Sequence, residues 1–183
     1  MKKITVHEIV LAAILAAASI TLNFFSISNL YSRITLYSLP LLVAGIFCGP
    51  VVSTLTGVVV GFITQLLSEY GLTITTPLWM ITPVIWSTIS WLIFNLFKKK
   101  KGSFISIVVT VVATSLCATA YNTIALWLDG IIMHYPTPLI WATIGTRILT
   151  AGIVCIPYII LIYETYVRIP NKYKYNPVLN EEN

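Results

Sequence analysis

The run Lys98-Lys99-Lys100-Lys101 separates two long apolar segments, 78–97 and 104–128, and the fold can be worked out from it in both directions. Nine of the eleven Lys and Arg residues lie in this run or in two further clusters, Lys2 with Lys3 and Arg168 with Lys172 and Lys174. Lys and Arg concentrate in the cytoplasmic loops of membrane proteins. We therefore predict that all three clusters are cytoplasmic, with an even number of membrane crossings between one cluster and the next.

The composition places this chain among integral membrane proteins. Of its 183 residues, 57% are hydrophobic and only 9% are charged, and the mean hydropathy is +0.90. A soluble domain of this size has too little interior to bury so much apolar surface. The net charge of +5 lies at the ends of apolar segments, where it suits the anionic headgroups of a lipid bilayer. No basic stripe with interleaved aromatics occurs, so nucleic acid is not an expected partner.

A membrane-spanning helix needs about 20 apolar residues, and six segments approach that length. We predict an all-α membrane protein with six transmembrane helices and cytoplasmic N- and C-termini, forming a single domain over 1–183. The first segment also has features of a cleaved signal peptide, but His7 and Glu8 interrupt that pattern, so we interpret it as a retained helix. The predicted helices cover about 9–25, 36–47, 51–67, 78–97, 104–128 and 139–163, and a polar tail follows at 168–183.

This topology puts three polar loops outside, at 26–35, 68–77 and 129–138. They are richer in functional groups than the inner loops, which are short or merely basic. A binding site that opens outward fits this asymmetry. The outer loops hold Arg33, Glu69, Asp129 and His134.

Arg147 is the most informative single residue, because it falls inside the last predicted helix, roughly 12 Å from Leu139. An Arg in the hydrocarbon region costs about 2.5 to 3.5 kcal/mol on insertion scales, so it usually faces a cavity and has a partner. Its planar fork of donors suits a ligand carboxylate, phosphate or ring acceptor. The alternative is a structural pair with Asp129 or with carbonyl groups at a helix end.

The stretch Gly71-Leu-Thr-Ile-Thr-Thr-Pro-Leu-Trp79 leads into the fourth predicted helix. Pro77 suits a first helical turn, and Thr75 or Thr76 is expected to cap it. Trp79 and Trp86 share one helix face, where they could stack on a flat ring. Alternatively, the two Trp residues belong to an aromatic belt at the membrane boundary.

Asn122 lies toward the outer end of the fifth predicted helix. Its amide both donates and accepts hydrogen bonds, as the edges of pterin and pyrimidine rings do. Asn122 could equally form a hydrogen bond that bridges two helices. We place the pocket between the outer halves of the last three helices, with Arg147 and Asn122 as polar contacts and Trp79 and Trp86 as apolar walls. The loops carrying Arg33 and preceding Trp79 would close it.

Four alanines on the first helix form two pairs of small residues four apart. Small side chains let helices approach closely, either within this chain or against a partner. The spacing does not say which pair faces outward. The four residues are Ala12, Ala13, Ala16 and Ala17.

The sequence contains none of the motifs expected of an ATPase, a hydrolase or a metalloenzyme. Outside the tail and the cytoplasmic helix ends, only Glu69 and Asp129 remain as acids, in different loops. Cys48, Cys117 and Cys155 are widely spaced in apolar segments and suggest neither a disulfide framework nor a zinc site. We therefore predict no catalytic residues, no metal and no cofactor, and a membrane enzyme is poorly supported.

Several short motifs resemble the substrate-binding S components of energy-coupling factor (ECF) vitamin transporters, in particular the folate, pantothenate and hydroxymethylpyrimidine group. They are Arg33-Ile-Thr-Leu-Tyr-Ser-Leu-Pro40, then Ala44-Gly45-Ile-Phe-Cys-Gly49-Pro50, then Asn122-Thr123 with Leu126-Trp127, and Arg147. The alanines of the first helix resemble the AxxxA contact of this family. The sequence departs from the pattern of folate-type relatives in two places, and both departures argue against folate as the substrate. Gly61 or Phe62 stands where folate-type relatives often carry an acid, and Thr-Thr-Pro-Leu-Trp replaces their third loop.

The resemblance implies a subunit of a bacterial cell membrane that binds a water-soluble vitamin outside and tumbles in the membrane to release it inside. It implies a transmembrane coupling subunit as the partner of the alanine face, and two ATPase subunits that supply energy. Folate and a smaller heteroaromatic vitamin or precursor remain equally open. From the residues alone, a small channel or a scaffold protein without a vitamin ligand is the alternative.

Overall fold

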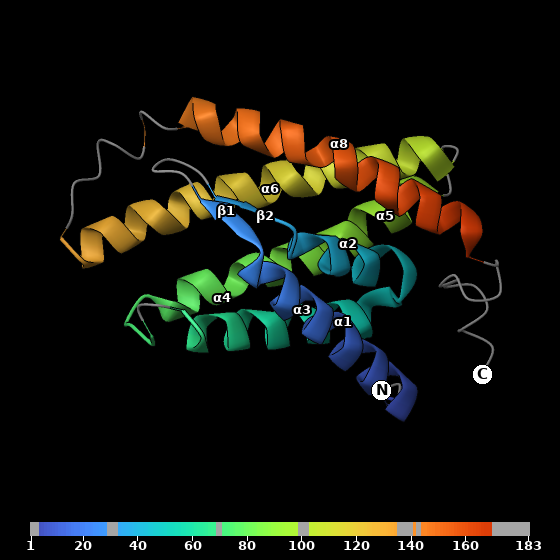
Figure 1. Cartoon of the computed structure of the whole chain (residues 1–183), viewed down its shortest axis with the longest axis horizontal. Coiled ribbons are helices and arrows are strands. Elements are labelled where there is room, and N and C mark those ends of the chain that lie inside the picture. Colours follow the sequence, from blue (N-terminus) through green and yellow to red (C-terminus); the bar gives the residue numbers. More distant parts are fainter. Residues whose placement is uncertain are drawn as a thin grey trace.

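The computed structural model describes residues 4–28, 33–68, 71–98, 103–134, 141 and 144–169, and these form a bundle of long helices (Figure 1). Among the described residues, five helices are long and apolar enough to cross a membrane, and a sixth apolar helix is shorter. The predicted all-α membrane fold is therefore confirmed. The long helices are α1 (Val6–Phe24), α3 (Gly49–Leu66), a continuous rod of α4 (Thr76–Val84), η1 (Ile85–Ile89) and α5 (Ser90–Lys98), then α6 (Ser103–Ile132) and α8 (Ile144–Arg168).

The short helix is α2 (Ser38–Phe47), which has 10 residues. At 1.5 Å per residue it spans about 15 Å, or about half of the hydrocarbon thickness. An antiparallel hairpin of β1 (Ser26–Ser28) and β2 (Arg33–Thr35) precedes it, with Ile27 opposite Ile34. The segment 26–35, which the sequence predicts to be an outer loop, therefore contains two short strands that were not predicted.

The break between α2 and α3 lies where the sequence predicts it. Gly49 has a φ of 86°, a left-handed conformation that glycine adopts without steric cost, and Pro50 follows in the first turn of α3. The carbonyl of Ala44 accepts a hydrogen bond from the Ser53 hydroxyl at 3.0 Å, so the two short segments are joined across the turn.

Small residues bring α3 and α4 into close contact. A methyl group on Gly57 would lie 2.8 Å from the Cα of Val84, and one on Gly61 would overlap the carbonyl oxygen of Met80. The two glycines are four residues apart, the spacing at which small residues form a flat strip on one helix face. The following helix contains Pro83 and then the π-helical turn η1, because proline cannot donate the backbone hydrogen bond that an α-helix requires there.

The core lies between α2, η1, α6 and α8. Leu41, Leu42, Ile107 and Tyr158 are fully buried in it. Polar links cross this core as well as apolar contacts: the hydroxyl of Tyr158 and that of Ser38 are hydrogen-bonded at 2.6 Å. Such bonds hold the start of α2 against the middle of α8.

The helix ends sort into two groups (Figure 1). The start of α1 and the ends of α5 and α8 lie at one end of the bundle, as an even number of crossings between the cation clusters requires. We call the opposite end, where α3 and α6 end and α4 and α8 begin, the distal end. That the distal end faces the outside of the cell remains the prediction drawn from the Lys and Arg clusters.

Candidate functional site

Two side chains of α6 fasten the first half of α4 at the distal end. The hydroxyl of Thr82 donates to the Oδ1 of Asn122 at 2.6 Å, and the hydroxyl of Tyr121 donates to the carbonyl oxygen of Leu78 at 2.7 Å. Asn122 therefore bridges two helices through its carbonyl oxygen. Among the described residues its amide nitrogen has no hydrogen-bond partner, so the group retains two donors for a ligand.

The two predicted tryptophan residues occupy different environments. Trp79 is partly buried on α4, three residues before Thr82 and therefore on the same side of the helix. Trp86 is only 9% exposed and packs edge-on against Tyr158, with ring centroids 6.3 Å apart. Trp79 thus lies on the side of α4 that carries Thr82, near the distal end, whereas Trp86 belongs to the core.

Arg147 lies near the beginning of the described part of α8, Ile144–Arg168, and its side chain is partly buried. Residues 142 and 143, which precede Ile144, lie outside the described part of the structure, so the predicted helix start at 139 stays a prediction. The cost of a charge falls steeply from the bilayer centre toward the interface, and the long side chain of an Arg near a helix end can reach the polar boundary. Its place at the distal end agrees with a role at the mouth of a pocket.

The functional groups predicted in the outer loops are only partly covered by the described structure. Arg33 is the first residue of β2 and pairs with Ser28 across the hairpin, but its side chain lies outside the described part of the structure. His134 is exposed and has a φ of 58° just after α6. Asp129 is partly buried near the end of α6. Glu69 lies outside the described residues.

The predicted threonine cap of α4 is wrong. Thr75 occupies the N-cap position and Pro77 lies in the first turn, but no side chain in the described part of the chain caps this helix. The hydroxyl of Thr76 instead accepts a hydrogen bond from the backbone N–H of Thr73 at 2.8 Å, and Thr73 and Thr75 share a bond between their hydroxyls at 3.0 Å. The hydroxyls of these threonines therefore form hydrogen bonds within the loop and do not accept from the free backbone N–H groups of α4.

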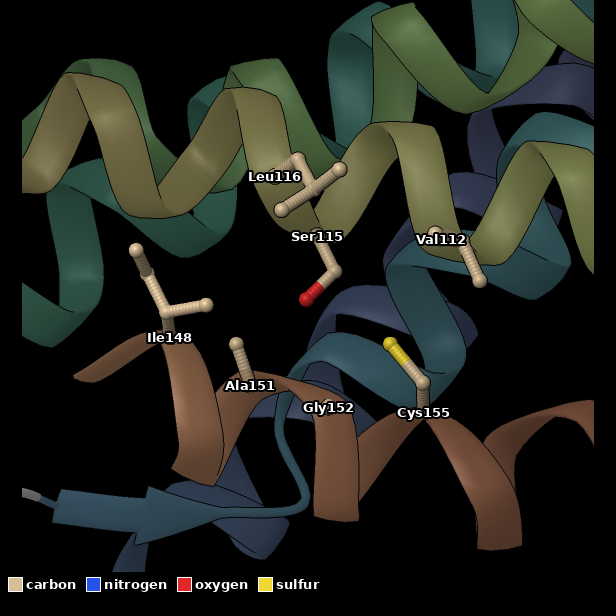
Figure 2. Close-up of a pocket in the computed structure, with 7 residues that line it drawn as sticks. All are labelled: Val112, Ser115, Leu116, Ile148, Ala151, Gly152 and Cys155. Carbon is tan, nitrogen blue, oxygen red and sulfur yellow. The ribbon is translucent and has the colours of Figure 1, made fainter. Parts of the chain in front are cut away.

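A hollow of about 170 Å³ lies between the middle of α6 and the distal half of α8 (Figure 2), and it is open on one side, because Val112, Leu116, Ile148 and Gly152 of its lining are exposed. We call it the cavity. Figure 2 shows the hydroxyl of Ser115 and the thiol of Cys155 pointing into this space from opposite helices. The rest of its surface is aliphatic. Sequence reasoning missed it, although Ala151 and Gly152 are the small residues that leave room for it. Its lining residues are Val112, Ser115, Leu116, Ile148, Ala151, Gly152 and Cys155.

The cavity lies closer to the middle of the bundle than Arg147 and Asn122, the two predicted polar contacts. Arg147, Ala151 and Cys155 are spaced four apart along one stripe of α8, so Arg147 stands about one turn beyond Ala151 toward the distal end. Ser115 and Asn122 are seven apart and share a stripe of α6, which puts Asn122 about 10 Å farther out than Ser115. The two stripes lead from the cavity to the two predicted ligand contacts.

The alanines of α1 divide into two pairs. Ala12 and Ala16 are 4% and 2% exposed because they pack within this chain. Ala13 and Ala17 are exposed and form the pair that faces away from the bundle. Within the described ranges, no group of three or more His, Cys, Asp or Glu side chains could hold a metal ion.

Comparison with known proteins gives a family. Residues 7–167 match the family model described as "ECF transporter, substrate-specific component". No curated protein matches the chain. Several solved structures share its fold, and two of them, at low sequence identity, each have a TM-score of 0.62.

The first of these structures is a crystal structure of FolT bound with folic acid, at 15% identity, which covers 91% of this chain and 96% of that one. The second is the S component of a bacterial ECF transporter, at 14% identity, which covers 89% of this chain and 98% of that one. At these identities the likeness concerns the fold. The family match covers most of the sequence, and the chain therefore belongs to the substrate-specific components of ECF transporters, which are multi-pass membrane proteins and not enzymes.

Proposed function

We propose that this chain captures a water-soluble vitamin or vitamin precursor at its distal end, on the outside of the cell, and delivers it as the specificity subunit of an ECF transporter. The observation that supports this most directly is that Asn122 and Arg147 both lie on the distal parts of their helices, α6 and α8. Ligand sites are typically apolar hollows with a few placed polar groups. The distal halves of α4, α6 and α8 have this character.

Each predicted contact has a distinct task in this proposal. Arg147 binds an anionic or acceptor group of the vitamin, and the amide nitrogen of Asn122 donates to a ring acceptor. Trp79 stacks on the ring, while the buried Trp86 forms the floor of the site and does not face the ligand directly. Arg33 closes the site from the hairpin.

The energy for uptake comes from other subunits in this proposal. The chain has no phosphate-binding loop of the usual kind, so ATP hydrolysis requires separate ATPase subunits. The exposed pair Ala13 and Ala17 docks on the transmembrane coupling subunit, and two ATPases act through that subunit. The flatness of this surface suits close helix–helix contact. The family match does not support the alternative of a channel or scaffold protein without a ligand.

The test is a thermal-unfolding screen of the purified chain in lipid nanodiscs with folic acid, pantothenate, hydroxymethylpyrimidine and other vitamins. A ligand at a hundred times its Kd stabilises the folded state by about 2.7 kcal/mol, which raises the melting temperature measurably. A matched screen of Asn122→Ala and Arg147→Ala should lose the shift. A folded wild-type protein that responds to no vitamin would contradict the proposal.

A further inference from the structure

We propose that the part of α4 before Pro83, 76–82, pivots about this proline, and that Tyr121 is the positioning residue that holds it where Trp79 contacts the substrate. We call 76–82 the distal segment of α4. The inference rests on the proposed function and deepens it, because it gives Tyr121 a task in the same site. It divides the rod of α4, η1 and α5 into a part that moves and a part that stays in place.

The rod is interrupted at the point about which the distal segment would pivot. Pro83 has no backbone N–H, so the carbonyl of Trp79, four residues earlier, receives no α-helical hydrogen bond from it. The π-helical turn η1 begins two residues later, at Ile85. Sharp kinks in helices occur at prolines and at π-helical turns, and here the two lie together. Bending therefore costs less free energy at Pro83 than elsewhere in the rod.

The side chains on the two sides of Pro83 are packed differently. None of the side chains from 77 to 81 is buried. Beyond the proline, Trp86, Ser87 and Ser90 are all buried. A segment with few buried contacts opens at a lower free energy than a segment of the core. The distal segment is therefore the part of the rod that opens most readily.

The start of the distal segment forms hydrogen bonds that can move with it. Thr75 and Thr76 are buried, but their hydroxyls bond to the hydroxyl and to the backbone N–H of Thr73, in the same loop. On the side of α3, Gly61 faces the backbone of Met80, and no side chain of Gly61 interlocks with α4. A flat glycine surface allows one helix to shift along another.

Among the described residues, two hydrogen bonds tie the distal segment to another helix, and they differ in leverage. Tyr121 donates to the carbonyl of Leu78 at 2.7 Å, and Thr82 donates to Asn122 at 2.6 Å. Leu78 lies five residues from Pro83, or about 7.5 Å, whereas Thr82 is next to it. A tilt of about 20° would displace Leu78 by about 2.5 Å and Thr82 by about 0.5 Å. The bond from Tyr121 is therefore the one that a pivot breaks.

This bond sets the spacing between two of the proposed ligand contacts. Trp79 directly follows Leu78, and Asn122 directly follows Tyr121. When the distal segment tilts away, the two contacts no longer meet the same ligand. The apparent affinity falls in proportion to the fraction of molecules that hold the binding position. Tyr121 raises this fraction without touching the substrate.

Hydrogen exchange, measured by mass spectrometry on the protein in nanodiscs, tests the pivot without any vitamin. Tyr121→Phe should speed exchange of the backbone amides at 78–82 about threefold to tenfold, because one hydrogen bond is lost, and should leave 90–98 unchanged. Tyr163→Phe is the matched control and should change neither, since the Tyr163 hydroxyl has no hydrogen-bond partner among the described residues. Unchanged exchange at 78–82, or equal acceleration along the whole rod, would overturn the proposal.

Pro83→Ala tests the position of the pivot. It supplies the N–H that the carbonyl of Trp79 lacks, so the helix becomes continuous. In this background Tyr121→Phe should change exchange at 78–82 by less than about twofold. The full effect of Tyr121→Phe in the Pro83→Ala background would overturn a pivot at Pro83. If Pro83→Ala fails to fold, the exchange pattern of Tyr121→Phe alone decides the proposal.

Binding tests the positioning role, with whichever of folic acid, pantothenate and hydroxymethylpyrimidine stabilises the wild type. Tyr121→Phe should weaken binding about threefold to tenfold, and adding Pro83→Ala should recover most of the loss. Faster exchange at 78–82 with unchanged affinity would overturn the positioning role of Tyr121 and leave vitamin capture standing. A folded wild type that binds no vitamin would overturn both the proposed function and the positioning role.

Discussion

The hydroxyl of Thr82 donates to the Oδ1 of Asn122 across 2.6 Å, and this bond joins α4 to α6 at the distal end. Thr82 is buried, so its hydroxyl depends on this one acceptor. The bond orients the amide so that its nitrogen remains available as a donor. Asn122 can therefore hold two helices together and contact a ligand at the same time.

Substitutions at this pair should have different consequences. Asn122→Ala removes the ligand donor and leaves the Thr82 hydroxyl unpaired, so it should weaken vitamin binding and lower stability by about 1 to 3 kcal/mol. Thr82→Val removes the bridge but keeps the amide, and should cost less affinity. Calorimetry and thermal unfolding of both variants measure the two effects. Equal loss of affinity in both would mean that Asn122 only holds α4 in place.

Arg147 should be a ligand contact rather than a structural charge. Arg147→Ala should weaken vitamin binding by about 1.5 to 3 kcal/mol, or roughly tenfold to a hundredfold, because a charge-assisted hydrogen bond is lost. Arg147→Lys should recover little if two donors of the guanidinium bind the ligand together. If Arg147→Ala binds the vitamin normally and only melts at lower temperature, the residue is structural, and the hairpin carrying Arg33 becomes the next candidate.

The surface of α1 should dock on the coupling subunit through Ala13 and Ala17. Ala13→Trp and Ala17→Trp should abolish co-purification and vitamin uptake while vitamin binding survives, because the bulky ring prevents close helix contact. Ala18→Trp, also exposed on α1, is the matched control and should have little effect. Ala16 is unsuitable for this purpose because it is 2% exposed and a Trp there would disrupt the fold. Normal co-purification of both Ala13→Trp and Ala17→Trp would exclude this surface.

The bond between Tyr158 and Ser38 should contribute to stability through the core. Tyr158→Phe leaves the buried Ser38 hydroxyl without its partner and should cost about 1 to 3 kcal/mol. Tyr163→Phe on the same helix is a fair comparison, since the Tyr163 hydroxyl has no hydrogen-bond partner among the described residues. Unfolding measurements that show the same loss for both variants would mean that this bond contributes nothing specific.

The architecture could be predicted from the sequence because a bilayer requires spanning helices to be long and apolar and favours Lys and Arg on the cytoplasmic side. Apolar runs of spanning length and clustered Lys and Arg residues were enough to predict the helices and to put the start of α1 and the ends of α5 and α8 at one end of the bundle. The break at Gly49 and Pro50 was equally clear, because both residues have strong conformational preferences. Single-sequence patterns are least reliable at helix limits, and the helix predicted at 36–47 begins at Ser38.

The site was harder to predict because its form depends on contacts between distant segments. Nothing in the order of residues shows that Trp86 would pack on Tyr158, or that Thr76 would bond to Thr73 instead of capping α4. The cavity depends on which faces of α6 and α8 meet, and small residues such as Gly152 occur in helices for many reasons. Asn122 and Arg147 could be selected from the sequence because polar groups are rare in such helices.

The most direct test of the central claim is mass spectrometry of small molecules released from the protein after gentle purification from vitamin-replete cells. The account predicts release of a vitamin or vitamin precursor, near one molecule per chain, and its absence from Arg147→Ala. A folded wild-type protein that releases no such compound, and is stabilised by no vitamin added afterwards, would contradict the account.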